Sequence, residues 1–161
     1  MSVLEAGSSA PDFSLLRALG EDPVTLSQHL GGPVVLLFVP LAFSGVCTKE
    51  LCHVSENWGV WGSLGAQVYA ISVDSPFVNR KWGSEMGAPF PILSDFNRTA
   101  TSAYGVLRED LGGLRGVANR SVFVIDAAGF LRYRWVGEDP GVLPPFDEVV
   151  AAVAALNQPA Q

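Results

Sequence analysis

The chain is short of cysteine, histidine and charged residues. Its 161 residues include two cysteines and two histidines, and 16% of the residues are charged. Two cysteines are too few to hold together a disulfide-built scaffold of this size. No run of eighteen apolar residues occurs, so no membrane-spanning helix is expected. These shortages direct attention to what the two thiols do.

Basic charge is scarce as well. The net charge of −6 at pH 7 argues against nucleic acid, and against an anionic membrane surface, as the main partner. The first thirteen residues, MSVLEAGSSAPDF, have neither a basic start nor an apolar segment, so no signal peptide is expected. We therefore expect a cytoplasmic location, where paired thiols tend to be catalytic, redox-sensing or metal-bound.

Hydrophobic residues, in contrast, are abundant. They make up 48% of the chain, which is enough for a sizeable core, and no linker or internal repeat is visible, so residues 1–161 are expected to form one domain. Continuous apolar runs at 33–39 and 67–73 predict central strands buried on both faces. A short strand is predicted to start with residues 11–13, and a brief strand followed by a helical turn is predicted within residues 24–30. The strands 121–126 and 130–135 are predicted to form a hairpin.

Helices are predicted between these strands. They cover residues 47–64, 76–86, 98–104 and 145–156. Strands that alternate with helices and end in a hairpin predict an α/β fold, with a central mixed β-sheet flanked by helices on both faces. The thioredoxin-like fold is the smallest common architecture with this order of elements.

The predicted helix 47–64 is unusual for its glycines. Gly59 and Gly62 lie within it, and Gly65 follows at the same spacing. An interior glycine costs about 1 kcal/mol relative to alanine. We expect this helix either to open more easily than its neighbours, or to use the glycines for close packing against another helix.

Cys47 occupies an informative position in this scheme. The loop 40–46 follows the buried strand 33–39 directly and leads into the predicted helix. Ligand sites in open α/β sheets lie just beyond the carboxyl ends of strands. A helix N-terminus offers unpaired backbone N–H groups and the positive end of the dipole, which favour a thiolate. A buried, inert cysteine fits the same position equally well.

Motifs around Cys47 distinguish the two interpretations. The pattern Pro40-x-x-x-Ser44-x-x-Cys47 resembles the peroxiredoxin signature Pro-x-x-x-Thr/Ser-x-x-Cys. Further segments resemble the family in order along nearly the whole chain: Pro11-Asp12-Phe13, Glu50, the stretch around Trp82, Phe90–Asp95, Ala103–Val106 and Arg120. The chain is thus similar to the peroxiredoxins, which are thiol peroxidases of thioredoxin-like fold.

The resemblance implies a role for each residue of the motif. Cys47 is the nucleophile that attacks a hydroperoxide. Ser44, Arg120 and the backbone N–H groups at the start of the helix stabilise negative charge on the peroxide oxygens. Glu50 orients the guanidinium of Arg120, and Pro40 shields the sulfur from water. The resemblance implies no haem, flavin or metal.

Cys52 is the second thiol, and we expect it to resolve a sulfenic acid on Cys47 by forming a disulfide. In an ideal helix the two Cα atoms lie about 8.6 Å apart, whereas a disulfide tolerates at most about 7 Å. The segment from Cys47 to about Gly62 therefore has to unwind first. The Cys-x-x-x-x-Cys pair resembles Q-type (bacterioferritin-comigratory) peroxiredoxins. Residues 42–45 instead resemble the alkyl hydroperoxide reductase E group, which usually relies on one cysteine, so resolution by an external thiol stays open.

Other interpretations are weaker. A disulfide oxidoreductase would need Cys-x-x-Cys, which is absent, and the soft ligands have no zinc-site spacing. A peroxide-sensing protein that uses the same cysteine is the remaining alternative. The resemblance also implies a hydroperoxide substrate, a thioredoxin- or glutaredoxin-like protein as reductant, and a homodimer with Phe43 at the dimer surface or the substrate pocket.

Overall fold

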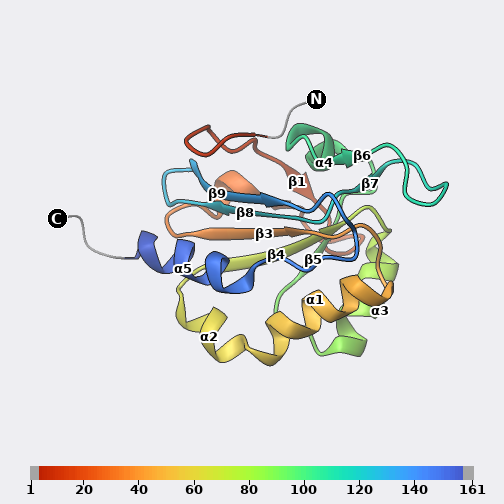
Figure 1. The fold of residues 1–161 in the computed structure, drawn as a ribbon, viewed down its shortest axis with the longest axis horizontal. Coiled ribbons are helices and arrows are strands. Elements are labelled where there is room, and N and C mark those ends of the chain that lie inside the picture. Colours follow the sequence, from red (N-terminus) through yellow and green to blue (C-terminus); the bar gives the residue numbers. More distant parts are fainter. Residues whose placement is uncertain (1–3, 158–161) are drawn as a thin grey trace.

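A five-stranded mixed sheet lies at the centre of the computed structural model, which describes residues 4–157. Its strands follow the spatial order β5-β4-β3-β8-β9 (Figure 1). The sheet consists of β3 (Val34–Phe38), β4 (Gln67–Ser72), β5 (Ile92–Ser94), β8 (Ser121–Ile125) and β9 (Leu131–Val136). Two short ribbons pair β1 (Ser14–Leu15) with β2 (Val24–Thr25), and β6 (Leu107–Arg108) with β7 (Val117–Ala118).

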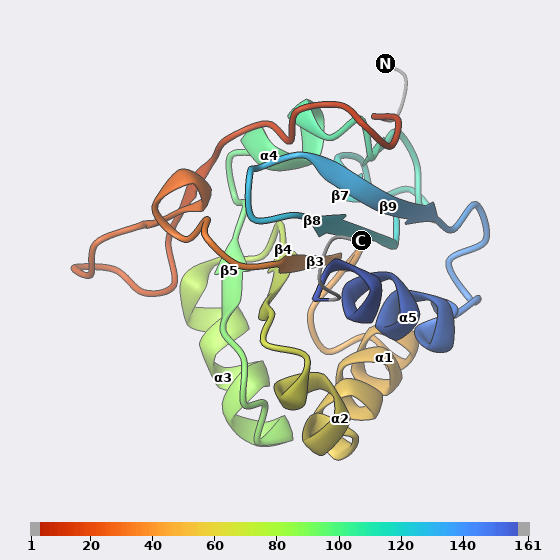
Figure 2. The same ribbon diagram turned by 90° about the vertical axis from the view of Figure 1, so that its left-hand side faces the viewer.

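The helices cover both faces of this sheet. One face carries α1, α2, α3 and α5, and the other carries α4 together with the short ribbons (Figures 1 and 2). The helices are α1 (Gly45–Glu56), α2 (Trp58–Ser63), α3 (Pro76–Met86), α4 (Thr99–Ala103) and α5 (Phe146–Leu156), and a single 3-10 turn, η1, spans Leu26–Gln28. The predicted thioredoxin-like fold, with a central mixed sheet between helices, is confirmed.

Strand β3 is the centre of the core, because all five of its residues are buried. It runs parallel to β4 and antiparallel to β8. Alternate side chains enter two separate hydrophobic clusters. Val34, Leu36 and Phe38 pack on the α4 side, and Val35 and Leu37 pack under α1 and α5. This explains why the sequence is apolar throughout the strand rather than alternating.

The predicted helix 47–64 is wrong in one respect, because the structure divides it into α1 and α2. The division falls at Asn57, whose backbone is not helical (φ −103°, ψ 22°). The Asn57 side chain donates a hydrogen bond of 2.8 Å to the carbonyl of His53, which satisfies an acceptor at the end of α1. An asparagine side chain competes with the helical ladder in this way, and the second helix restarts directly after it.

Easier opening of this segment stays a prediction, whereas the structure contradicts close packing of helices through the glycines. Gly59 and Gly62 lie in α2, whereas both cysteines lie in α1, so the glycines do not weaken the turns between the thiols. A Cβ at Gly59 would meet nothing within 4 Å, and at Gly62 its nearest neighbour would be Trp58 of the same helix. Close helix packing is therefore not their role either.

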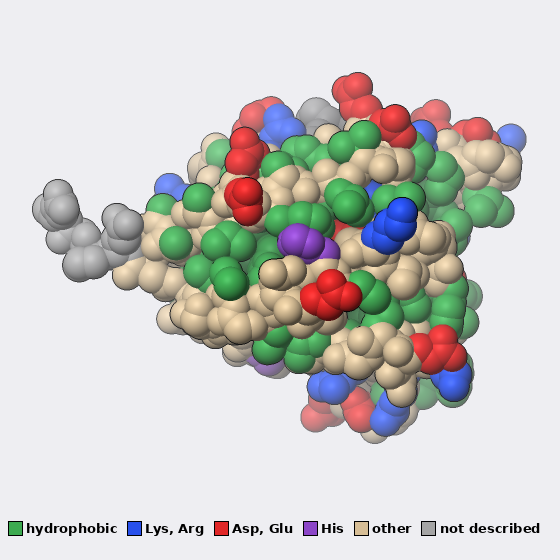
Figure 3. All heavy atoms as spheres, turned by 60° about the horizontal axis from the view of Figure 1, so that its bottom comes forward, with side chains coloured by type: hydrophobic (Ala, Val, Ile, Leu, Met, Phe, Trp, Pro, Cys, Tyr) green, Lys and Arg blue, Asp and Glu red, His purple; other side chains and the backbone are tan. Residues whose placement is uncertain are grey.

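The face that carries α1, α2 and α5 exposes hydrophobic side chains near its middle, and charged side chains gather toward its rim (Figure 3). Within residues 4–157, no helix is both long and apolar enough to cross a membrane.

Replacing Phe123 tests the packing at the middle of the sheet. Its buried ring has edge contacts with Phe38 and Tyr104, at centroid distances of 5.7 and 5.1 Å. Phe123→Ala is expected to lower the free energy of unfolding by about 3–5 kcal/mol. Val60→Ala is the control, because this side chain on α2 is 51% exposed and its loss should cost under about 0.5 kcal/mol. Equal urea midpoints for the two variants would contradict the assignment of the core.

Candidate active site

The loop that leads from β3 into α1 is held in an unusual conformation. Phe43 has a φ of 66°, a left-handed conformation that non-glycine residues rarely adopt. Two contacts hold the loop. The Ala42 N–H donates to Asp74 Oδ2 at 2.8 Å, and the Phe43 ring packs on Trp82 with a centroid distance of 6.2 Å. The loop therefore presents the start of α1 in a defined position.

Cys47 lies in the first turn of α1 and is fully buried. The first α-helical bond of this turn runs from the Thr48 N–H to the Ser44 carbonyl at 2.9 Å. The N–H groups of the three preceding residues have no partner within the helix, as at every helix start. The Cys47 sulfur thus lies at the positive end of the α1 dipole.

Arg120 brings a cation to this sulfur. Its Nη1 and Nη2 atoms both lie 3.5 Å from Cys47 Sγ. The sheet accounts for the meeting, because Phe38 at the end of β3 pairs with Ser121 at the start of β8. Residues just after Phe38 and just before Ser121 therefore share one edge of the sheet. Nη2 also donates to the Pro140 carbonyl at 3.0 Å.

Glu50 lies one turn after Cys47 and forms a buried ion pair with Arg120. Its Oε1 accepts from Arg120 Nη1 at 2.8 Å, and the two side chains are 0% and 2% exposed. Burial raises the pKa of Glu50 to about 7, although the adjacent Arg120 charge acts to lower it. Burial acts to lower the pKa of Arg120, but the negative charges of Glu50 and Cys47 raise it overall. Glu50 therefore contacts one of the two terminal nitrogens of the guanidinium.

A cavity of about 250 Å³ opens at these groups. Its walls include Pro40, Ser44, Cys47 and Arg120. The Ser44 hydroxyl donates to the Leu41 carbonyl at 2.9 Å rather than capping α1. Its proton is therefore in use, and its lone pairs remain free to accept a hydrogen bond from a ligand in the cavity.

The structure thus brings together all but one of the side chains that the sequence singled out. Cys47, Ser44, Arg120 and Pro40 line the cavity, and Glu50 lies behind it. Cys52 is the exception. It is half-buried, further along the same uninterrupted helix as Cys47, and unbonded to it.

Sequence reasoning missed a group of hydrogen bonds that fastens the first turn of α1. Trp82 Nε1 donates to Thr48 Oγ1 at 3.1 Å, and Thr48 Oγ1 donates to the Ser44 carbonyl at 2.8 Å. It also missed the Pro140 carbonyl, which receives Arg120. A backbone acceptor on a distant loop carries no sequence signal, and neither does a contact between residues 34 positions apart.

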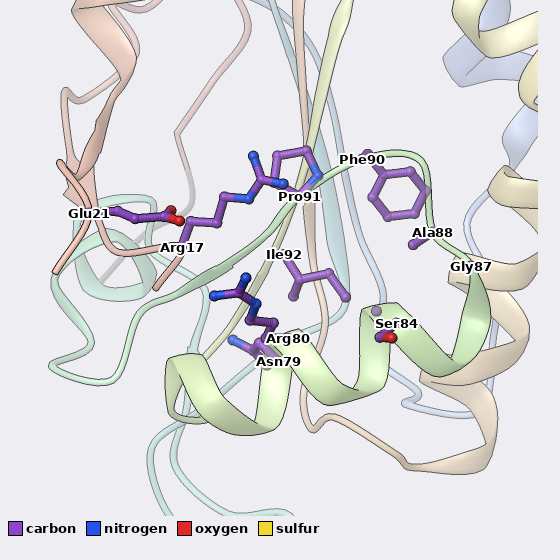
Figure 4. Close-up of a pocket in the computed structure, with 11 residues that line it drawn as sticks. Arg17, Glu21, Asn79, Arg80, Ser84, Gly87, Ala88, Phe90, Pro91 and Ile92 are labelled. Atoms are coloured by element: carbon purple, nitrogen blue, oxygen red, sulfur yellow. The ribbon is translucent and has the colours of Figure 1, made fainter. Parts of the chain in front are cut away.

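A second cavity, of about 370 Å³, lies away from these groups, between α3, β5 and the segment that follows β1. Figure 4 shows Arg17 reaching it from that segment and Arg80 from α3, beside Phe90, Pro91 and Ile92. It has no sulfur in its walls. In the part of the chain that the structure describes, no three His, Cys, Asp or Glu side chains are grouped to hold a metal ion.

A thioredoxin-like fold with a buried cysteine at a helix N-terminus, contacted by a guanidinium at an open cavity, defines the class of thiol peroxidases. Comparison with known proteins identifies the family. Residues 6–134 match the model of the AhpC/TSA family. The chain therefore belongs to the AhpC/TSA family and is a peroxiredoxin-type, thiol-dependent peroxidase.

Individual relatives cover almost the whole chain. Alkyl hydroperoxide reductase E of Mycobacterium tuberculosis is 37% identical over 158 residues, which are 96% of this chain and 99% of that protein. Peroxiredoxin-2 of Mus musculus is 34% identical over 95% of this chain and 79% of its own length. Among solved structures, peroxidoxin BcpB of M. tuberculosis superposes with a TM-score of 0.83 and 30% identity, over 96% of this chain and 99% of that one.

The buried carboxyl of Glu50 makes stability depend on pH. An unfolded Glu50 loses its proton near its ordinary pKa of 4.5, whereas the folded protein keeps the proton to about pH 7. Between these values the unfolded state binds fewer protons, so the free energy of unfolding falls as pH rises and levels off above about 7. The fall is on the order of 3 kcal/mol.

Urea unfolding of Cys47→Ser and of the double variant Cys47→Ser/Glu50→Gln from pH 4.5 to 8 measures this effect with no second acid beside Arg120. The difference between the two proteins should change across the window in the stated direction. A constant difference would show that Glu50 titrates alike in the folded and unfolded states.

Proposed function

We propose that this protein reduces hydroperoxides through nucleophilic attack by the Cys47 thiolate on the O–O bond. The step is Cys47–S⁻ + ROOH → Cys47–SOH + RO⁻, and protonation of RO⁻ then yields the alcohol or water. The observation that carries the proposal is the pair of Arg120 nitrogens at 3.5 Å from Cys47 Sγ, at the wall of an open cavity. A fixed cation there stabilises the thiolate before attack and the oxygen charge that develops during it.

Three kinds of group are available to a peroxide bound in the cavity. The two terminal nitrogens of Arg120 and the free N–H groups of the first turn of α1 donate hydrogen bonds to the peroxide oxygens. The Ser44 hydroxyl, whose proton is used by Leu41, accepts the hydrogen bond of the peroxide O–H. Pro40 closes one wall and limits access of water to the sulfur.

For the second half of the cycle, we propose that Cys52 resolves the sulfenic acid by an intramolecular disulfide. This requires at least the part of α1 between the two cysteines to unwind, because helical geometry keeps their Cα atoms about 8.6 Å apart. The hydrogen bonds from Trp82 to Thr48 and from Thr48 to Ser44 have to break when the first turn opens.

A second candidate, resolution by an external thiol, is favoured by one observation. Helix α1 is fastened at both ends: Trp82 holds its first turn through Thr48, and His53 stacks on Phe146 of α5 with a centroid distance of 4.0 Å. A firmly held α1 delays the approach of Cys52, which leaves time for another thiol to react first.

The partners stay predictions. We propose a thioredoxin- or glutaredoxin-like protein as the final reductant, a cytoplasmic location, and assembly as a homodimer. The dimer is supported by three large side chains exposed around α3 and the end of β5: Phe43, Phe77 and Phe96, at 48%, 68% and 61%. An isolated monomer would leave these rings in water.

Substitutions at the site test the first half of the cycle. Cys47→Ser should reduce peroxide consumption to the background rate. Arg120→Lys keeps the charge but loses the forked donor, and should slow the reaction by about 10²–10³-fold. The measurement is the second-order rate of peroxide-dependent change in tryptophan fluorescence. Arg80→Lys, an exposed arginine in the second cavity, is the control and should react at the wild-type rate. Undiminished peroxide consumption by Cys47→Ser would refute the proposal.

Mass spectrometry after treatment with one equivalent of peroxide separates the two modes of resolution. With Cys52 as the resolving thiol, the wild type loses two hydrogens and Cys52→Ser gains one oxygen at Cys47. With an external thiol, both proteins gain oxygen equally until the thiol is added. Cys47→Ser serves as the reference that should gain nothing.

A further inference from the structure

Cys47, Arg120 and Glu50 form a buried group in which one cation faces two acids. The three side chains are 0%, 2% and 0% exposed. Arg120 Nη1 donates to both acids, at 3.5 Å to Cys47 Sγ and 2.8 Å to Glu50 Oε1. If both acids were ionised, the group would carry a net negative charge out of contact with water. An uncompensated buried charge costs several kcal/mol.

Glu50 is poorly equipped to remain a permanent carboxylate. Its Oε1 accepts one hydrogen bond, from Arg120, and its Oε2 is buried without a partner. A carboxylate held as an anion in a protein interior usually accepts two or three hydrogen bonds. Arg120 Nε is also buried without a partner, so the guanidinium does not grip Glu50 through two nitrogens.

No other described charge is placed to compensate a second anion. Besides these groups, the buried charged side chain among residues 4–157 is Asp95, which accepts hydrogen bonds from the first turn of α4. On α1, Lys49 is exposed and His53 stacks on α5.

The loop before α5 and the β6–β7 ribbon supply only peripheral charges. Glu138 and Asp139, next to Pro140, are exposed. Arg108, on β6, is half-buried and donates to Asn119 Oδ1 at 3.1 Å and to the Glu138 carbonyl at 3.2 Å.

We propose that Cys47 and Glu50 share one negative charge opposite Arg120, so that Glu50 holds a proton whenever Cys47 is a thiolate. The two acids then titrate as a coupled pair rather than independently. Each ionisation makes the other harder, because the like charges lie on the same guanidinium in a medium of low dielectric.

The consequence for catalysis rests on the proposed function. Attack converts the thiolate to a neutral sulfenic acid and leaves the Arg120 charge without an anion. Glu50 then becomes ionised by giving its proton to RO⁻. The balanced step is Cys47–S⁻ + Glu50–COOH + ROOH → Cys47–SOH + Glu50–COO⁻ + ROH. The buried group keeps zero net charge before and after the step. Glu50 is a positioning residue here, because it acts through Arg120.

Infrared spectroscopy of the reduced protein tests the sharing without measuring activity. The C=O stretch of a protonated carboxyl is distinct from the bands of a carboxylate, and Glu50→Gln assigns it. In Cys47→Ser, which cannot form a thiolate, the band should titrate at about pH 7, as burial of Glu50 dictates. In reduced wild type the C=O band of protonated Glu50 should persist to a pH at least about one unit higher.

The reciprocal measurement follows the Cys47 thiolate by ultraviolet absorbance. It uses Cys52→Ser as background, so that a single thiol titrates. Adding Glu50→Gln keeps an oxygen that accepts a hydrogen bond from Arg120 but removes the negative charge that competes with the thiolate. The Cys47 thiolate should therefore persist to a pH at least about one unit lower.

The outcomes divide cleanly. Equal carboxyl titrations in wild type and Cys47→Ser would overturn the proposal. It would also be overturned if the Cys47 thiolate became protonated at a higher pH in Glu50→Gln than in the parent protein, because that result indicates that Glu50 only orients Arg120. If Glu50→Gln does not fold, the difference spectrum between wild type and Cys47→Ser still decides, because Glu50 is the buried carboxyl that shares Arg120 with Cys47. None of these results bears on the proposed peroxidase reaction, which the loss of activity in Cys47→Ser tests separately.

Discussion

The buried guanidinium of Arg120 is the interaction on which the site depends. A cation in a protein interior is tolerated only when anions and carbonyl groups surround it, and here Glu50, Cys47 and the Pro140 carbonyl do so. Each partner lies on a different turn or loop, so one side chain fixes the first two turns of α1, the start of β8 and the loop before α5. The cation that contacts the sulfur also joins these separate parts of the chain.

The sheet determines where this interaction can form. Because β3 and β8 are antiparallel neighbours, with Phe38 opposite Ser121, the end of one strand meets the start of the other. The residues that follow β3 supply the loop and the helix N-terminus, and the residue that precedes β8 supplies Arg120. The turn after β4 lies at the same end of the sheet, where Asp74 holds the loop through Ala42. The site thus lies at the end of the sheet where β3 ends and the antiparallel strand β8 begins.

Helix α1 carries two conflicting demands. Its first turn must be rigid, so that the sulfur and the N–H groups point into the cavity, and the contacts of Trp82 with Thr48 and Phe43 provide that rigidity. Direct bonding of Cys47 to Cys52 demands that the same turns open. In the proposed cycle, the free energy that holds α1 closed would set how long an oxidised Cys47 persists, and with it which thiol reaches the sulfur first.

Local sequence patterns predict much of the fold. The apolar run of β3, the hairpin of β8 and β9, and the α3 helix, which starts at Pro76 and ends at Met86 before Gly87, follow from periodicity and turn residues. The division of the 47–64 helix at Asn57 was missed, because an asparagine in a helical stretch ends it only where its side chain finds a backbone carbonyl, here that of His53.

The sequence by itself singled out Cys47 as the expected nucleophile, together with its neighbours in the motif, since Pro40, Ser44 and Glu50 lie within the same short segment, whose spacing local geometry preserves. Only the tertiary structure decided that Arg120, seventy-three positions away, contacts the sulfur, and that burial leaves Glu50 Oε2 without a partner. Such facts depend on strand pairing and on the exclusion of water, which no local pattern encodes.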